Sequence, residues 1–220
     1  MRRVLKPGDV ARDVFLLCTT TVRSRAEKAR LVSVADIVAE AAAEYEAAAT
    51  STTLHLLSEQ TDVGGVVTMG EMSKLYDEKM VREDSPGRHI YDRLMVAPML
   101  GLCPLCAQRI VSTLDHHLPK SKYPSLACVS SNLVPTCSDC NRLKRDRRPH
   151  NEEDQTIHPY FDDFEDGRWL EAEVVENTPP AVRFYVQPRL GGRQQSAHGL
   201  AIISNCSGWL LCTQHRQARS

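Results

Sequence analysis

Residues 103–144 read CPLCAQRIVSTLDHHLPKSKYPSLACVSSNLVPTCSDCNRLK, and the prediction of the fold rests mainly on this segment. It opens with the pair Cys103 and Cys106 and carries the pair Cys137 and Cys140 near its end, each with C-x-x-C spacing. That spacing lets two thiols of one short turn bind the same tetrahedral ion, and two matched pairs are typical of a four-cysteine zinc site. The alternative is a set of redox-active or buried thiols without metal. We predict a closed structural Zn²⁺, which leaves no open position for a catalytic water.

The thirty residues between the two pairs form a segment that the zinc would hold closed at its base. This segment contains Asp115 and His116, and Asn141 directly follows the last cysteine. Hydrolysis of a phosphodiester needs a base that activates water and a divalent cation that balances charge on the phosphate. Histidine is a suitable base near neutral pH, and carboxylate and amide oxygens suit Mg²⁺. Asp115, His116 and Asn141 are therefore of the residue types that such hydrolysis needs.

The order of these residues resembles the HNH endonuclease superfamily. The motif is D-H-x-x-P at 115–119 followed by N-L-V-P-x-C-x-x-C-N-x-x-K at 132–144. The resemblance implies a ββα-metal fold, in which a hairpin and a helix enclose one catalytic ion. It implies that Asp115 and Asn141 bind Mg²⁺ or Mn²⁺ and that His116 is the general base. It also implies that Asn132 braces the loop bearing the histidine, that DNA is cut, and that the products carry 5′-phosphate and 3′-hydroxyl ends.

Two adjacent histidines leave the identity of the base to be decided. A shift of one residue in the strand register would turn His117 toward the metal instead of His116, because side chains alternate along a strand. In the HNH motif the base stands three residues before the proline, which here is Pro119 and selects His116. His117 would then contact the substrate or lie at the surface.

A wider stretch of the sequence resembles one subgroup of the HNH superfamily. Residues 113–124, together with His158-Pro-Tyr-Phe-Asp162, resemble a bacterial subgroup of HNH proteins that includes the nuclease subunit of Septu-type anti-phage systems. This resemblance implies a defence role and a partner ATPase. His158 itself has two interpretations, because it either approaches the active site or packs in a turn before Pro159.

Charge is unevenly distributed along the chain. The formal net charge is -1, whereas residues 101–150 carry eight cations and three acids, a balance of +5. We therefore predict a local surface for DNA phosphates and not a uniformly basic coat. The candidate DNA contacts are Lys120, Lys122, Arg142, Lys144 and Arg145. The alternative is a solvated helix end whose cations are favoured by the helix dipole.

The remaining sequence predicts an α+β protein in three parts. A helical N-terminal region at 1–86 would serve as a scaffold or docking element, the zinc-stapled ββα-metal core would occupy 87–150, and a β-rich extension would occupy 151–220. Ser85-Pro86-Gly87 marks the first boundary, and an acidic stretch at 152–166 follows the core. The expected elements are helices at 9–17, 24–49 and 73–81, a turn at Gly64-Gly65, and a hairpin of 169–175 with 182–186.

No apolar run follows the basic N-terminus, and the most apolar stretch, 94–106, is short and broken by prolines. We therefore expect neither a signal peptide nor a membrane span. Eight cysteines without an export signal suit a reducing compartment, so we expect a cytoplasmic protein. The competing function is a non-catalytic zinc-finger DNA-binding or interaction subunit. It would explain the cysteines and the basic residues, but not Asp115, His116 and Asn141 in one register.

Overall fold

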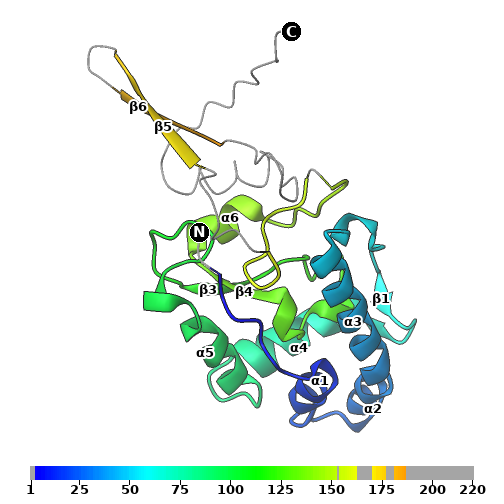
Figure 1. Ribbon diagram of the computed structural model, residues 1–220. Helices are drawn as coiled ribbons and strands as arrows, with labels where there is room; N and C mark the ends of the chain where they lie inside the picture. Colours follow the sequence, from blue (N-terminus) through cyan, green and yellow to red (C-terminus); the bar gives the residue numbers. More distant parts are fainter. Residues whose placement is uncertain (1–2, 153, 163–169, 177–180, 187–220) are drawn as a thin grey trace.

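The computed structural model describes residues 3–152, 154–162, 170–176 and 181–186 (Figure 1). Within these ranges the chain forms six α-helices and three two-stranded antiparallel sheets. The helices are α1 (Ala11–Thr19), α2 (Arg25–Ser33), α3 (Ala35–Ser51), α4 (Met69–Tyr76), α5 (Arg88–Val96) and α6 (Ser138–Lys144). The strands are β1 (Asp62–Val63), β2 (Val67–Thr68), β3 (Thr113–His116), β4 (Leu133–Thr136), β5 (Leu170–Val175) and β6 (Ala181–Val186). The mixed α+β composition agrees with the sequence prediction.

The helical region predicted over 24–49 is confirmed, but the structure divides it into α2 and α3 at Val34. The Ser33 hydroxyl donates to the Arg30 carbonyl at 2.8 Å, and that carbonyl is the acceptor that a continuous helix would offer to the Val34 amide. The Val34 amide instead bonds to the Leu31 carbonyl at 3.2 Å, which tightens the last turn of α2. The buried Val34 side chain then fills the junction between the two helices.

The turn predicted at Gly64-Gly65 is confirmed, since it joins β1 to β2 with positive φ angles of 63° and 68°. Positive φ angles favour glycine, because it has no Cβ. A Cβ at Gly64 would also lie 2.5 Å from Ile37 Cδ1, so this turn packs closely on α3.

The third predicted helix starts earlier than expected. A capping box between Thr68 and Glu71 begins α4 at Met69, and α4 ends at Tyr76. A π-helical turn, Asp77–Val81, continues it. Such π turns are rare and occur often beside functional sites.

One hydrophobic core runs through the described chain, from Val14 in α1 to Leu133 in β4. It therefore contains side chains from both sides of the boundary expected at 86 and 87. A Cβ at Gly87 would meet the Lys79 carbonyl at 2.8 Å and Cys18 Sγ at 3.2 Å, so the triplet at 85–87 is a packed turn and not an open linker. The N-terminal helices and the cysteine-bearing segment share one core, which differs from the separate docking region that the sequence suggested.

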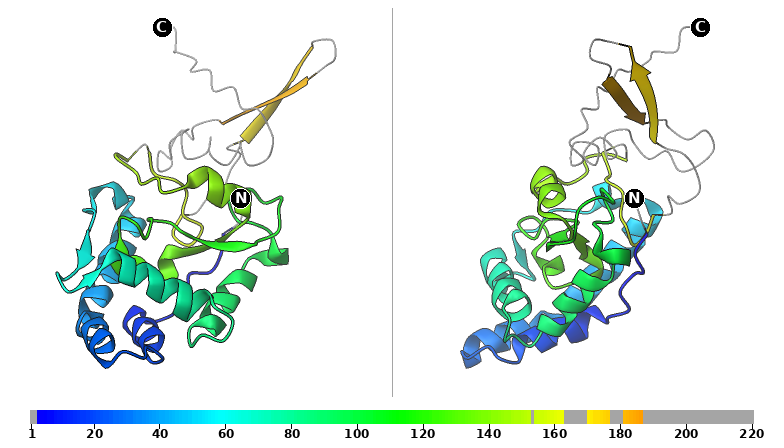
Figure 2. Two further views of the ribbon diagram at one scale, coloured as in Figure 1. Left: turned by 180° about the vertical axis from the view of Figure 1, so that it is seen from behind. Right: turned by 90° about the vertical axis from the view of Figure 1, so that its left-hand side faces the viewer.

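The β3–β4 sheet lies between two groups of helices. Helices α4 and α5 lie on one side of it and α6 on the other, and the views in Figure 2 show the same arrangement. The register pairs Asp115 with Val134 and His116 with Leu133. With helices on both sides of the sheet, the end of β3 lies against both α6 and the N-terminal helices.

The C-terminal hairpin is confirmed in part, because β5 and β6 pair antiparallel from Leu170 opposite Val186 to Val175 opposite Ala181. The expected turn at 177–180 and Trp169 lie outside the described residues, and so do Asp163, Glu165 and Asp166 of the acidic stretch. Among the residues that are described, no helix has the length and apolar character needed to cross a bilayer.

Candidate active site and metal centre

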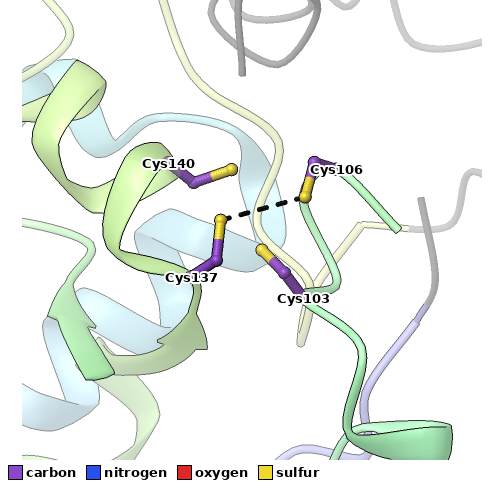
Figure 3. A group of neighbouring side chains, drawn as sticks. All are labelled: Cys103, Cys106, Cys137 and Cys140. Atoms are coloured by element: carbon purple, nitrogen blue, oxygen red, sulfur yellow. Dashed lines mark hydrogen bonds between the residues drawn. The ribbon is translucent and has the colours of Figure 1, made fainter. Parts of the chain in front are cut away.

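The four predicted zinc ligands lie together. The Sγ atoms of Cys103, Cys106, Cys137 and Cys140 all lie within 4.8 Å of one another, and all four side chains are buried (Figure 3). The Cys106 and Cys137 sulfurs are 3.9 Å apart. Sulfurs at the corners of a tetrahedron around Zn²⁺ would be separated by about 3.8 Å. The cluster can therefore hold a zinc ion with four sulfur ligands.

Local backbone bonds bring the thiols to this position. The Cys103 amide donates to the Arg109 carbonyl at 2.7 Å, and the Ala107 amide donates to the Cys103 carbonyl at 2.7 Å, which folds the first pair into a tight loop. Cys137 is the N-cap of α6 and Cys140 lies in its first turn. Hydrogen bonds from Cys103, from Cys140 and from the amides of Gln108 and Arg109 lower the pKa of Cys106. These hydrogen bonds thus favour the thiolate form of Cys106, whereas the bond to Cys106 and burial raise the pKa of Cys103.

The segment between the cysteine pairs supplies the candidate active site. β4 passes through Cys137 into α6, so β3, β4 and α6 form an antiparallel hairpin followed by a helix. A pocket of about 430 Å³, which we call the His116 pocket, is lined by Asp115 and His116 from β3 and by Asn141 from α6. Three residues that the sequence predicted for catalysis thus border one space.

The opposite wall of the His116 pocket comes from the N-terminal part of the chain. Tyr76, Asp77 and Val81 contribute from the end of α4 and its π turn, and Tyr91 contributes from α5. The Tyr76 ring meets the His116 imidazole edge-on, with 4.6 Å between ring centroids. Nothing in the sequence pattern singled out these residues, because they are ordinary helix positions that only tertiary packing brings to the site.

His116 is oriented by a main-chain carbonyl. Its Nε2 lies 2.9 Å from the Ala127 carbonyl oxygen. A carbonyl can only accept, so Nε2 carries the proton and Nδ1 keeps the free lone pair that a general base needs. Burial lowers the pKa of His116 to about 3. The imidazole is therefore neutral at physiological pH.

His117 has a different environment. Its ring packs against the buried His158 ring with 4.1 Å between centroids, and it does not line the His116 pocket. His158 Nε2 lies 2.6 Å from the Tyr45 hydroxyl, and the Tyr160 amide donates to His158 Nδ1 at 3.2 Å. His117 and His158 therefore belong to a packed interior cluster. Of the two interpretations of His158, the structure places it in the packed turn.

Lys144 is not on the DNA-facing surface that the sequence suggested for it, because its side chain is only 5% exposed. Its ammonium lies 3.0 Å from Asp115 Oδ2 and donates to the His116 carbonyl at 2.6 Å. Position 144 is the last residue of α6, and the helix turns this side chain inward onto β3. Lys144 thus fixes the Asp115 carboxylate and the end of the strand.

The residues present fit the Mg²⁺ or Mn²⁺ that the HNH resemblance implies. Asp115 offers a carboxylate and Asn141 an amide oxygen at the same pocket. Mg²⁺ sites are commonly built from one or two protein oxygens, with water and substrate phosphate completing the coordination. In the part of the chain that the structure describes, only the four cysteines form a group of three or more cysteine, histidine or acidic ligands. An ion at Asp115 and Asn141 would therefore depend on water and substrate.

Asn132 holds the loop that follows His116. The side chain is fully buried, its Oδ1 accepts from the Leu118 amide at 2.8 Å, and its Nδ2 donates to the Leu118 carbonyl at 3.0 Å. Nδ2 also lies 3.3 Å from the Leu126 carbonyl, one residue before Ala127. One amide therefore ties the loop after His116 to the segment whose carbonyl orients the imidazole.

Replacing Asn132 with alanine should lower the free energy of unfolding by about 2–4 kcal/mol, because each buried polar group left without a partner costs about 1–3 kcal/mol. Ser131→Ala is the matched control. Its buried hydroxyl has no hydrogen-bond partner among the described residues, so its removal should cost less than about 1 kcal/mol. Urea unfolding of both variants measures the difference. Equal losses in the two variants would show that Asn132 does not brace the loop.

The remaining predicted DNA contacts are mostly engaged within the protein. Lys120 pairs with Asp77 at 2.7 Å, and it lines the His116 pocket. The other pairs are Lys122 with Glu59 at 3.5 Å and Arg142 with Asp139 at 3.0 Å. Arg145 also lines the pocket. Asp146 does so as well, and sequence reasoning had not included it among the site residues.

Comparison with known proteins gives one informative similarity. Residues of this chain are 34% identical over 148 positions to protein Ea31 of Escherichia phage lambda, which covers 66% of this chain and 50% of Ea31. The chain thus spans about half the length of that phage protein, whose name states no activity. No family model matches the chain, and no solved structure matches it.

Proposed function

We propose that this protein is a metal-dependent HNH nuclease that hydrolyses DNA phosphodiester bonds. The observation that carries the proposal is the meeting of Asp115, His116 and Asn141 at one pocket, with His116 Nε2 bonded to the Ala127 carbonyl. This is the arrangement that hydrolysis needs, because a neutral imidazole faces the space where oxygen ligands stand. The hairpin-then-helix order of β3, β4 and α6 supports the same assignment.

In this proposal His116 Nδ1 takes a proton from the attacking water while Nε2 stays bonded to the Ala127 carbonyl. Asp115 and Asn141 would hold the Mg²⁺ or Mn²⁺, which when bound would supply positive charge to the phosphate and the leaving oxygen. Lys144 keeps the Asp115 carboxylate in place. The cysteine cluster fixes the start of α6 and therefore the position of Asn141, since Cys140 precedes Asn141 in the helix.

Cleavage of supercoiled plasmid tests the proposal. The protein should nick plasmid with Mg²⁺ or Mn²⁺ and should stop when EDTA removes the divalent ion. Asp115→Ala should reduce the rate by about 10²-fold or more, because loss of a transition-state contact costs about 10²–10³-fold. Asn141→Ala should act in the same direction, with partial rescue by Mn²⁺.

Asp36→Ala is the control for loss of a carboxylate, since Asp36 is exposed, pairs with Arg12 and does not line the His116 pocket. It should cut like the wild type. Binding of DNA without any metal-dependent cleavage, in wild type and variants alike, would favour the competing function of a non-catalytic zinc-binding subunit.

The defence role and the ATPase partner stay predictions from the extended motif. The similarity to a phage protein indicates that relatives of this chain occur in phage genomes.

A further inference from the structure

Arg145 lies at the junction of α6 and the His116 pocket. It directly follows the last residue of α6, its side chain is exposed, and it lines the pocket with Asp115, His116 and Asn141. We infer that Arg145 binds the phosphate of the DNA strand at the reacting position. This inference rests on the proposed nuclease function and names the residue that would hold its substrate.

The backbone of Arg145 is unusual for an arginine. Its φ and ψ are 54° and -140°. The Arg147 amide donates to the Lys144 carbonyl at 3.3 Å, which closes a four-residue turn with Arg145 in the second position. The angles are near those of a type II′ turn, a position that strongly favours glycine. Thr52, Leu100 and Ala107 also have positive φ, and of these four residues only Arg145 lines the His116 pocket, so its strained backbone and its place at the pocket together point to a use for the side chain.

The charges around the pocket leave Arg145 available. Lys120 is paired with Asp77, and Lys144 is paired with Asp115. Among the described residues no ion pair involves Arg145, although Asp77, Asp115 and Lys120 line the same pocket. Asp146 also lines the pocket, but it is exposed and solvent screens its charge. Of the two described cations that line the pocket, Lys120 is paired and Arg145 has no ion pair with a described residue, so Arg145 is the one that can meet an incoming anion.

The chemistry of the guanidinium defines the ligand. Its planar fork donates two parallel hydrogen bonds to two oxygens of one phosphate, which an ammonium cannot do. Contacts to phosphate oxygens carry no base information, so this residue would act on any sequence. The phosphate gains negative charge as water attacks, and Arg145 should therefore stabilise the transition state more than the bound substrate.

The test uses single-turnover cleavage of plasmid by the full chain with Mg²⁺. Arg145→Ala should cut about 10²-fold more slowly, and Arg145→Lys should lie between this variant and the wild type. Arg147→Ala is the matched control, because Arg147 is also exposed, lies two residues away and does not line the pocket. It should change the rate less than about 3-fold.

Arg145→Gly separates function from folding. Glycine relieves the positive φ, so the melting temperature should rise by about 2–4 °C while the cleavage rate falls as in Arg145→Ala. Duplex DNA binding without divalent ion, followed by fluorescence anisotropy, gives an independent readout. Loss of one phosphate contact should reduce the slope of log affinity against log salt by about 0.9 in Arg145→Gly but not in Arg147→Ala.

The outcomes distinguish the two proposals. If the wild type cuts, His116→Ala does not, and Arg145→Gly matches the wild type in both rate and salt slope, the role of Arg145 is refuted and the nuclease stands. A second outcome is that neither the wild type nor any variant cuts DNA, while Arg145→Gly alone lowers the slope of log affinity against log salt. In that case Arg145 is a phosphate contact and the nuclease proposal fails.

Discussion

Replacing His116 with alanine should lower the rate of DNA cleavage by about 10²–10⁴-fold, the usual cost of removing a general base. The side chain borders the His116 pocket, and the Ala127 carbonyl holds its Nε2 so that Nδ1 is the free nitrogen. Zinc content and DNA affinity should stay close to those of the wild type, because His116 is not a member of the four-cysteine cluster that could bind zinc. The measurement is plasmid nicking with Mg²⁺, with zinc analysis and DNA binding on the same samples.

His117→Ala is the matched control for His116→Ala, since the two residues are adjacent and both are buried. His117 packs on His158 outside the pocket, so its loss should lower stability while the rate per folded molecule falls much less. A dead His117→Ala beside an active His116→Ala would show that the base is one residue further along. Normal cleavage by both would refute a histidine base at this site.

Removal of the zinc should have the second large effect. Purified protein should contain about one zinc per chain, and Cys137→Ser should lose it together with the folded arrangement of the hairpin and α6. The physical reason is that this ion would join two segments whose thiols are all buried at one point. Metal binding contributes about 10–16 kcal/mol in small zinc modules, so a lost ligand is expected to abolish cleavage through unfolding.

Cys18→Ala is the control for the zinc experiment. Cys18 is also fully buried, but it lies in α1 and outside the cysteine cluster. This variant should keep its zinc and lose only about 1 kcal/mol of stability. Thermal unfolding, metal analysis and thiol titration of Cys137→Ser and Cys18→Ala give the stability, the zinc content and the reactive thiols of each variant. Wild-type protein that contains no zinc and whose four thiols react freely would contradict the metal site.

Local sequence patterns predicted those structural elements whose interacting residues lie close together in the sequence. The Gly64-Gly65 turn and the pairing of β5 with β6 follow from turn chemistry and alternation, and both are found. The break at Val34 was missed, because it depends on one side-chain hydrogen bond from Ser33 that competes with the helix. The periodic pattern of apolar residues does not reveal whether a side chain competes for a helix hydrogen bond.

The candidate site shows the same division. The two C-x-x-C pairs predicted a shared ion, and the four sulfurs are found together. The motif spacing that selected His116 over His117 agrees with the side chain that lines the pocket, although the catalytic role itself stays a prediction. The prediction that Lys144 contacts DNA at the surface is wrong, because the local charge balance does not show toward which side of the helix a lysine side chain points.

The paired cysteines that could hold a metal ion, the order of acid, histidine and asparagine, and the short hairpins were predictable from the sequence, since these depend on residue type and near spacing. The ion pairs among the described residues and the side chains on the far wall of the pocket follow from tertiary packing alone. Tyr76 and Asp77 reach the pocket because the N-terminal helices and the cysteine-bearing segment bury one common core. Ion pairs such as Lys144 with Asp115 and Lys120 with Asp77 join residues far apart in the chain. A linear pattern holds no information on such contacts, because they exist only after distant segments have packed.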